Sequence, residues 1–250
     1  MNSVVIDCLP ESVARYRDGH AIVAVDVIRA TTTLVTALTA GRRCFVASTA
    51  LQARALASAL HEPLLAGELA GEIPDGFEIG NSPAEVARRA DVDRPLVLLS
   101  SSGTQLLHNA QACEHAYVAC FRNHGAVADH IVRRHAQVAL IGAGTRGEFR
   151  EEDQICCAWI AARLMDYGYG VANPETQALI ERWRHASAEA CLVSRSVDYL
   201  RRSGQLDDLD FILDHLNDVK HAHTIRGSEV LLASAADRDA AVGVDAERVA

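Results

Sequence analysis

Short apolar runs alternate along the chain with stretches that are rich in Ala, Leu and Arg and that repeat with helical period. This alternation is typical of βαβ units around a mostly parallel sheet. The predicted strands cover residues 4–7, 21–27, 44–47, 64–66, 96–100, 116–120 and 138–141. The predicted helices lie near residues 31–40, 49–60, 83–90, 104–111, 124–135 and 151–167. The pattern therefore predicts an α/β fold.

The pattern changes after Tyr167. Longer helical stretches follow at about 174–203 and 207–216, and then two predicted strands at 219–225 and 229–232. We expect this part to form a lobe or a hairpin at the edge of the sheet. Residues 234–250 are rich in Ala and Asp and have little periodicity, which predicts a disordered tail. Residues 1–233 are therefore expected to form a single domain, with a second lobe from about residue 168 left open.

Composition and charge narrow the function classes. The chain has 250 residues, of which 49% are hydrophobic and 23% charged, which is ordinary for a globular protein. The formal net charge of -9 argues against a nucleic-acid partner and against an anionic membrane surface. No signal peptide and no membrane-spanning stretch is evident, so a cytoplasmic protein is expected. A homodimer is common for enzymes of this size, and the sequence leaves the oligomeric state open.

Polar residues follow the predicted second strand. In open parallel sheets ligands bind at the carboxyl ends of the strands. There Asp26 can ligate a hard cation such as Mg²⁺, and Arg29 can donate a pair of hydrogen bonds to an anion. Thr31 and Thr32 lie at a predicted helix start, where hydroxyl and N–H groups can hold phosphate. An Asp26–Arg29 ion pair with a Thr helix cap is the structural alternative.

A long Gly-rich loop follows the predicted fourth strand, over residues 65–83. Loops of this length are usually functional or disordered. Glu68 comes directly after the strand and is a candidate metal ligand, and Asn81 is a candidate for binding phosphate. Ser82 and Glu85 match a helix capping box, which favours a structural role for both.

Small hydroxyl residues follow the predicted fifth strand. Ser101, Ser102, Gly103 and Thr104 suit a close approach of the backbone to phosphate oxygens. A G-x-S-x-G elbow is absent, which disfavours serine hydrolase chemistry. After the sixth strand, Arg122 and Asn123 offer a cation and an amide to the same rim, and a capped helix start is the alternative for Asn123.

The predicted seventh strand leads into a Gly-rich segment, residues 142–147, that formally matches the dinucleotide fingerprint G-x-G-x-x-G. An acidic cluster follows it in place of the usual strand and acidic residue, so nicotinamide binding is only an alternative reading. Gly144 and Thr145 are candidates for binding phosphate. Glu152 or Asp153 can face the cation site, although helix-dipole compensation also explains acidic residues in a first helical turn.

Five strand-end segments thus carry carboxylates, hydroxyls, Arg or Gly, while the strand interiors are apolar. Acidic ligands for one hard cation, together with several anion-binding junctions, favour Mg²⁺-assisted handling of a phosphorylated small molecule. A Walker A motif is absent, which disfavours nucleotide-driven transfer by that route.

Six motifs in order carry a family resemblance. They are Val25–Thr33, Ala66-Gly67-Glu68, Gly76–Pro83, Ser102-Gly103-Thr104, Phe121-Arg122-Asn123, and Ala143-Gly144-Thr145 with Glu152-Asp153. Over residues 4–232 the chain resembles the 2-phosphosulfolactate phosphatase family, the ComB-like proteins. The resemblance implies a three-layer α/β/α fold with a mostly parallel or mixed sheet, and a C-terminal part made of helices and a hairpin.

The resemblance also implies an activity. It points to a Mg²⁺-dependent phosphatase that hydrolyses (R)-2-phospho-3-sulfolactate to 3-sulfolactate and phosphate, the second step of a route to coenzyme M. Gly142 stands where Cys is common in the family and Ser102 where Asn is common, so another phosphorylated carboxylic or sulfonic acid is also open as the substrate. A catalytically silent phosphometabolite-binding protein and a nicotinamide oxidoreductase are the other hypotheses.

On this reading Asp26, Glu68 and Asp153 hold Mg²⁺, and Arg29 neutralises charge on the phosphate. Whether Asp26 serves as ligand or nucleophile is open at this point. Arg122 and Arg146 are expected to bind the second anionic group of the substrate, a sulfonate or carboxylate, and exposed surface charge is the competing reading for both.

Overall fold

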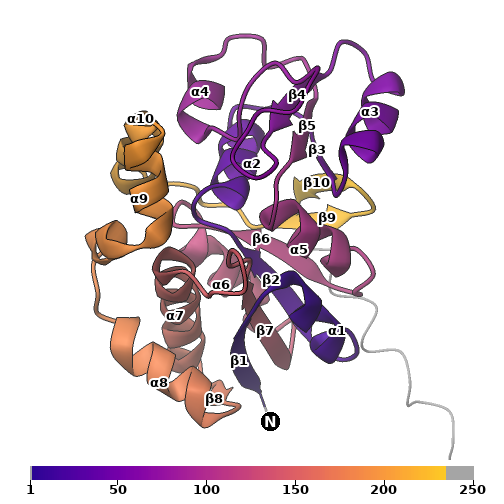
Figure 1. Ribbon diagram of the computed structural model, residues 1–250. Helices are drawn as coiled ribbons and strands as arrows, with labels where there is room; N and C mark the ends of the chain where they lie inside the picture. Colours follow the sequence, from indigo (N-terminus) through magenta and orange to yellow (C-terminus); the bar gives the residue numbers. More distant parts are fainter. Residues whose placement is uncertain (1, 235–250) are drawn as a thin grey trace, which may run out of the picture.

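The computed structural model describes residues 2–234, which form one ten-stranded sheet with helices on both faces (Figure 1). The strands are β1 (Ser3–Cys8), β2 (Ala21–Val25), β3 (Cys44–Ala47), β4 (Leu64–Gly67), β5 (Leu96–Leu99), β6 (Ala116–Ala119), β7 (Gln137–Gly142), β8 (Gly170–Val171), β9 (His223–Arg226) and β10 (Glu229–Leu232). The α-helices are α1 (Val13–Tyr16), α2 (Ala30–Thr39), α3 (Ala50–Ser58), α4 (Pro83–Arg88), α5 (Gly103–Ala110), α6 (His124–Ile131), α7 (Glu151–Asp166), α8 (Pro174–Trp183), α9 (Arg195–Arg202) and α10 (Leu206–Asp214), and the 3-10 helices are η1 (Pro10–Ser12) and η2 (Ala188–Val193).

The sheet consists of two parallel blocks joined by an antiparallel hairpin. Its strand order is β4-β5-β3-β10-β9-β6-β2-β7-β1-β8. The first three strands run parallel to one another, and so do the last five. The three pairings between the blocks, β3 with β10, β10 with β9, and β9 with β6, are all antiparallel. Three reversals leave the two blocks running in opposite directions.

The hairpin β9–β10 therefore lies at the centre of the sheet, and the prediction of an edge hairpin is wrong. Residues 223–225 of β9 are buried, and the strand pairs with β10 on one side and β6 on the other. The periodicity of a strand reports which faces are covered but not which strands lie beside it, and these partners are distant in sequence.

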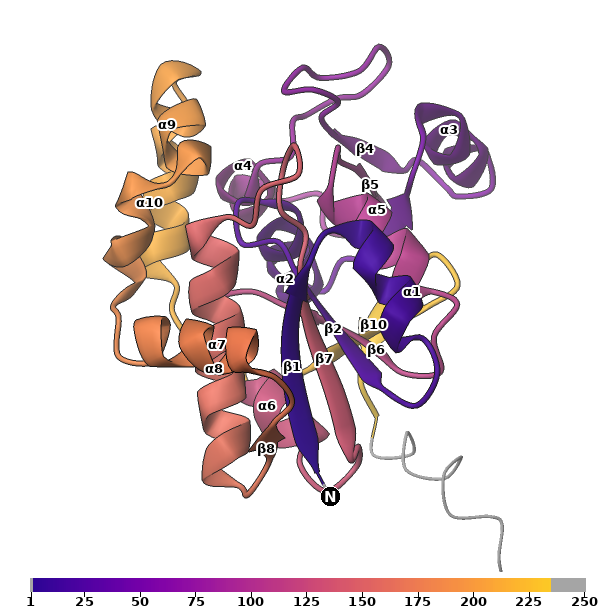
Figure 2. The ribbon, with the colours of Figure 1, turned by 60° about the horizontal axis from the view of Figure 1, so that its bottom comes forward.

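Alternating side chains of β1 face two separate cores. Val4 and Ile6 of β1 face one core with α6, α7 and the helices that follow it, whereas Val5 faces the other core with α1, α2 and α5. The two-residue period of a strand explains the division. Figure 2 shows α6, α7 and α8 on one side of β1, β7 and β2, with α1 on the other. The α/β fold and its three-layer α/β/α arrangement are confirmed.

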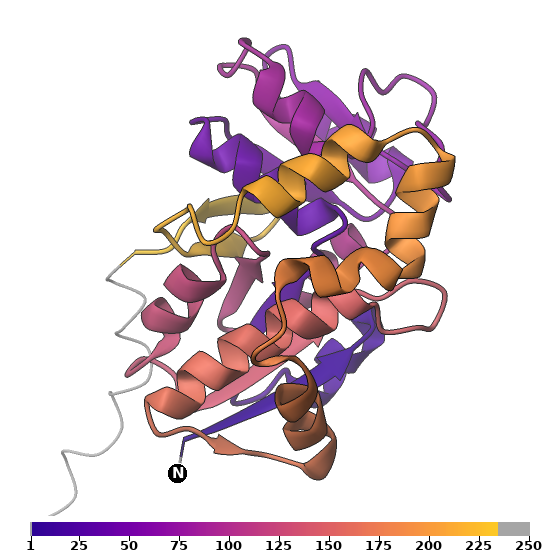
Figure 3. The same cartoon turned by 90° about the vertical axis from the view of Figure 1, so that its left-hand side faces the viewer.

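The helical stretch predicted at 174–203 is three pieces, α8, η2 and α9. Ser194 begins the last piece, because its Oγ accepts a hydrogen bond of 3.2 Å from the N–H of Val197. From α8 to α10 the chain crosses α7 and reaches the β3–β4–β5 block, where α10 packs against α4 (Figure 3). No helix within residues 2–234 is long and apolar enough to cross a bilayer.

Candidate active site

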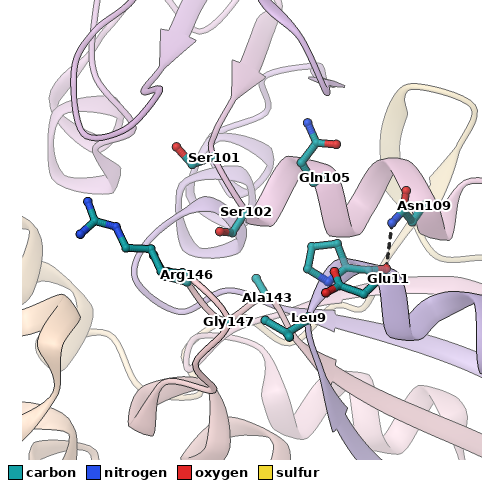
Figure 4. A pocket seen from close by; sticks show the side chains of 11 residues that line it. Leu9, Glu11, Ser101, Ser102, Gln105, Asn109, Ala143, Arg146 and Gly147 are labelled. Carbon is teal, nitrogen blue, oxygen red and sulfur yellow. Dashed lines mark hydrogen bonds between the residues drawn. The ribbon is translucent and has the colours of Figure 1, made fainter.

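A pocket of about 380 Å³ lies where the segments that follow β1, β5 and β7 meet (Figure 4). The segment after β1 contributes Leu9, Pro10 and Glu11. The other lining residues come from α5 and the two residues before it, and from the loop after β7, and most of them are polar. They are Ser101, Ser102, Gln105, Asn109, Ala143, Thr145, Arg146 and Gly147.

Asp26 lies beside this pocket, one residue beyond the end of β2, and is 8% exposed. Its carboxylate packs against Gly103, the first residue of α5, which directly follows the pocket residue Ser102. A Cβ atom at position 103 would lie 2.1 Å from Asp26 Oδ2 and 2.6 Å from the Cβ of Ala30. The glycine is therefore what allows segments of the two opposed strand blocks to meet here.

Three carboxylates share this buried region. Burial, followed by the charges of Glu152 and Glu68, raises the pKa of Asp26 to about 7, while Arg29 and a backbone hydrogen bond from Ala30 act in the opposite direction. Burial and the charges of Asp26 and Glu152 raise the pKa of Asp153. Burial also raises the pKa of Glu152, whose Oε2 has no hydrogen-bond partner among the described residues. Negative charge is crowded here in a way that a cation would relieve.

Asp153 and Glu68 brace the loops on either side of Asp26. Asp153 Oδ1 accepts a hydrogen bond of 2.9 Å from the N–H of Val27, and its Oδ2 accepts one of 3.3 Å from the N–H of Gly144. Glu68 accepts bonds of 2.8 Å from the N–H of Ser101 and 3.0 Å from its hydroxyl, and one of 2.8 Å from the N–H of Gly71. Between residues 2 and 234 no three His, Cys, Asp or Glu side chains are placed to hold a metal ion. Asp26, Glu68 and Asp153 thus do not form a ready three-carboxylate site.

Arg29 follows Asp26 by three residues, and its positive charge acts to lower the pKa of Asp26. Its guanidinium donates to Asp208 Oδ2 on α10 over 2.6 Å, and the two side chains are 7% and 3% exposed. The alternative prediction of an Asp26–Arg29 ion pair is wrong, because Arg29 pairs with Asp208 of α10 instead.

Several predicted phosphate ligands are buried and already hydrogen-bonded within the protein. Thr31 and Thr32 donate their hydroxyls to the carbonyls of Asp26 and Val27, over 2.7 Å in both cases. Asn81 accepts from the hydroxyl of Thr33 over 2.8 Å. These residues hold the turn that carries Asp26 and stabilise the start of α2.

Two further candidates have the same character. Thr104 donates its hydroxyl to the carbonyl of Ser100 over 2.8 Å. Asn123 is fully buried, and its amide bonds the N–H of Cys120 and the carbonyl of Val118 in the turn after β6. Its side chain makes no cap bond to the helix that follows.

The two predicted anion-binding arginines lie in different environments. Arg122 is 7% exposed, pairs with Asp218 over 2.6 Å and donates to the hydroxyl of Thr36 over 2.9 Å, so it ties the hairpin linker to α2. Arg146 is exposed and lines the pocket, and in Figure 4 its guanidinium extends away from Ser101 and Ser102. The structure brings Arg146, Ser101, Ser102 and Thr145 together at the pocket, and Arg122 is not part of its lining.

The Gly-rich segment after β7 does not have the geometry of a dinucleotide turn. Thr145 and Glu148 close a short reverse turn through bonds of 2.9 and 3.1 Å, and α7 begins only at Glu151. The third glycine, Gly147, therefore lies in an exposed turn outside the helix. A Cβ at position 142 would lie 2.3 Å from the ring of Phe149, so this aromatic ring fills the space beside Gly142.

Sequence reasoning missed parts of the site. Leu9, Pro10 and Glu11 follow a predicted strand, so the strand-end rule applied to the first strand would have found them. Gln105 and Asn109 share a face of α5, which the helical period alone could have shown. Asp208 had no local signal, because its partner is 179 residues away.

Comparison with known proteins adds a family to this geometry. The family model of 2-phosphosulpholactate phosphatase matches residues 7–220. The chain belongs to this family. A probable 2-phosphosulfolactate phosphatase of Parasynechococcus marenigrum is 34% identical over 199 residues, which cover 76% of this chain and 81% of that protein.

Two more relatives carry the same name. The protein of Pseudothermotoga lettingae is 36% identical over 158 residues, 63% of this chain and 67% of its own length. The protein of Symbiobacterium thermophilum is 31% identical over 205 residues, 77% of this chain and 86% of its own length. By name, members of the 2-phosphosulfolactate phosphatase family are phosphoric monoester hydrolases, and the family resemblance inferred from the six motifs is confirmed.

Proposed function

We propose that this chain is a Mg²⁺-dependent phosphatase that hydrolyses 2-phospho-3-sulfolactate, or a related phosphorylated small acid, to 3-sulfolactate and phosphate in a reaction of the coenzyme M biosynthesis type. Family membership supports the reaction class. The observation that carries the proposal is Asp26, a carboxylate with a pKa raised to about 7, beside a pocket lined by hydroxyls and Arg146.

The donor set fits Mg²⁺ with few protein ligands. Mg²⁺ usually keeps several waters and binds through one or two carboxylates together with substrate phosphate, so a three-carboxylate cage is not required. Asp26 would hold the ion, and the crowded charges of Glu152 and Asp153 favour a cation there. When bound, Mg²⁺ supplies electrostatic stabilisation of the phosphoryl oxygens.

Other side chains of the site bind the phosphate and the second anionic group of the substrate. Ser102 and Thr145 present hydroxyls to the phosphate, Ser101 is held at the pocket by its bond to Glu68, and the positive charge of Arg29 acts on Asp26. Arg146, at the exposed part of the lining, binds the sulfonate or carboxylate. Uncatalysed phosphate monoester hydrolysis is so slow that the site has to lower the barrier by about 20 kcal/mol, which requires cation and fixed donors together.

Phosphate release tests the proposal. The purified chain is incubated with 2-phosphosulfolactate, phospholactate and other phosphorylated small acids, with Mg²⁺ or with EDTA. We expect fast release from the sulfonated substrate that EDTA abolishes. Release from a different acid alone would keep the phosphatase and change its substrate, whereas release from none would favour a silent phosphometabolite-binding protein.

A further inference from the structure

We propose that Asp208 of α10 is a positioning residue that fixes the Arg29 guanidinium at the turn that carries Asp26. The inference rests on the proposed function, in which Arg29 neutralises charge on the phosphate. Asp208 lies in the C-terminal helical segment, far in sequence from the strand ends that form the pocket. It thus gives that segment a part in catalysis through another residue.

The geometry of Asp208 leaves its carboxylate little freedom. One oxygen, Oδ2, accepts from Arg29 Nη1 over 2.6 Å. The other, Oδ1, accepts from the hydroxyl of Ser82 over 2.5 Å and from the N–H of Ala84 over 3.1 Å. Donors on both sides fix the orientation of the carboxylate and therefore the place of the guanidinium bonded to it.

Burial sets this pair apart from the other ion pairs of the described chain. The Asp208 and Arg29 side chains are 3% and 7% exposed, and no other ion pair between residues 2 and 234 has both members below 10%. A buried ion pair is weak evidence for stability, because desolvation of the two charges offsets their attraction. The buried Arg29–Asp208 pair is therefore better explained by a role in positioning Arg29 than by a gain in stability.

Arg29 has donors to spare for this role. A guanidinium carries five N–H groups, and the bond to Asp208 is the one side-chain hydrogen bond that Arg29 makes within the described residues. Its positive charge reaches Asp26, where it counteracts the neighbouring carboxylates. Asp208 therefore anchors one end of the guanidinium, and the charge of Arg29 still acts on Asp26.

The chain offers a matched control in the preceding residue. Asp207 also lies in the first turn of α10, and it pairs with Arg88 over 3.1 Å. Both members of that pair are well exposed, at 77% and 62%. Asp207→Asn removes the same charge from the same helical turn without touching Arg29.

The experiment compares Asp208→Asn, Asp207→Asn, Arg29→Gln and the double variant Arg29→Gln/Asp208→Asn, all checked for folding by circular dichroism and Tm. We expect Asp208→Asn to lower kcat/KM by about 30-fold or more, and Asp207→Asn to stay within 2-fold of wild type. Because Asp208 acts through Arg29, adding Asp208→Asn to Arg29→Gln should change kcat/KM by less than about 3-fold. Asp208→Glu replaces Asp208→Asn if the latter fails to fold.

A chemical rescue separates positioning from a merely structural role. Guanidinium ion added at millimolar concentration should restore part of the activity of Arg29→Ala, and the restoration should be lost in Arg29→Ala/Asp208→Asn. Wild-type activity in Asp208→Asn, or effects of Arg29→Gln and Asp208→Asn that multiply in the double variant, would overturn the proposal.

If the wild type releases phosphate from no acid, the proposed function fails, and the inference is then decided by calorimetric binding of inorganic phosphate to the same proteins. Equal weakening in Asp208→Asn and Arg29→Gln, with wild-type affinity in Asp207→Asn, supports Asp208 as the residue that positions Arg29. Wild-type affinity in Asp208→Asn, or no binding by any of the proteins, refutes it.

Discussion

Asp26 occupies surroundings that disfavour its charge. It is buried, faces the charges of Glu152 and Glu68, and touches the backbone of Gly103. Groups with strongly perturbed pKa values next to a pocket are characteristic of functional sites. At the scale of the residue, the site is thus marked by a carboxylate that the fold holds at a cost in stability.

Asp26→Asn should abolish turnover while the fold survives. Because the folded chain keeps a proton on Asp26 that the unfolded chain releases, this group makes stability fall as pH rises from about 4 to 7. In EDTA at pH 8, Asn should therefore raise the free energy of unfolding, by about 2 kcal/mol. Urea unfolding at pH 8 and pH 5 measures this, and near-normal activity of the variant would remove Asp26 from the mechanism.

Gly103→Ala tests the close approach at Asp26. The new Cβ has no room beside Oδ2, so the carboxylate has to move, and a misplacement of about 1 Å can cost about 100-fold in rate. We expect kcat/KM to fall by about that factor. Gly170→Ala is the control, because its Cβ would meet its nearest neighbour at an ordinary 3.6 Å. Full activity of Gly103→Ala would show that the contact has no functional role.

At the scale of elements, equivalent strand-end loops have taken different roles. The loop after β7 opens to the pocket through Arg146, whereas the loop after β6 carries Arg122 into bonds with Asp218 and Thr36. Both loops follow a buried parallel strand and carry arginine, so their local sequences do not separate the two roles. The difference arises because the segment leading to β9 passes beside β6, where the N–H of Val219 donates to the carbonyl of Arg122 over 2.9 Å.

Arg122→Gln should therefore affect stability, whereas Arg146→Gln should affect substrate binding. Loss of Arg122 leaves partly buried acceptors without their donor, so we expect about 1–3 kcal/mol lower stability and little change in kcat/KM of the folded protein. Loss of Arg146 should leave Tm unchanged and raise KM about 10-fold, since it weakens binding of the second anionic group. Steady-state kinetics and thermal melts distinguish the two, and an unchanged KM in Arg146→Gln would contradict its role.

His223 makes the central hairpin sensitive to acid. Burial, and then the charge of His221, lowers the pKa of His223 to about 4, and its Nδ1 is buried without a partner in the described chain. The unfolded imidazole takes up a proton as pH falls below about 6.5 and the folded one does not until about 4, so stability falls through that window. Between pH 7 and pH 5, wild type should lose about 1–2 kcal/mol more than His223→Gln in urea unfolding. His221→Gln, at an exposed neighbouring position, should keep most of this loss, because burial is the larger cause of the lowered His223 pKa.

At the scale of the whole molecule, the site forms where two opposed parallel blocks and the C-terminal helices meet. Glu68 follows β4, Asp26 follows β2, and Asp208 belongs to α10. Tyr199 of α9 strengthens this meeting point by donating its hydroxyl to the carbonyl of Gly71 over 2.9 Å. Ligand binding at such a junction should stabilise the entire fold.

Mg²⁺ should raise the Tm of the chain in a concentration-dependent way, because a ligand that binds only the folded state stabilises it by mass action. At about 100 times Kd the gain is about 2.7 kcal/mol. Asp26→Asn should lose this shift, whereas Glu72→Gln, which removes an exposed carboxylate from the loop after β4, should keep it. A shift of equal size in Asp26→Asn would place the cation elsewhere.

The sequence alone specifies the alternation of strands and helices, since buried strands and amphipathic helices leave their periods in the chain. It also determined that Asp26, Ser101 and Ser102 lie at strand ends, and six motifs were enough to identify the family. Position after a strand needs no knowledge of distant contacts.

How these segments meet was set by the tertiary structure. It placed β9 and β10 between the two blocks, gave Asp153 and Glu68 backbone partners, took Arg122 away from the pocket and brought Asp208 to Arg29. Each of these depends on contacts between residues far apart in sequence. Pairing order and the direction of a side chain's hydrogen bonds are set by the packing of the entire chain, and no local pattern encodes them.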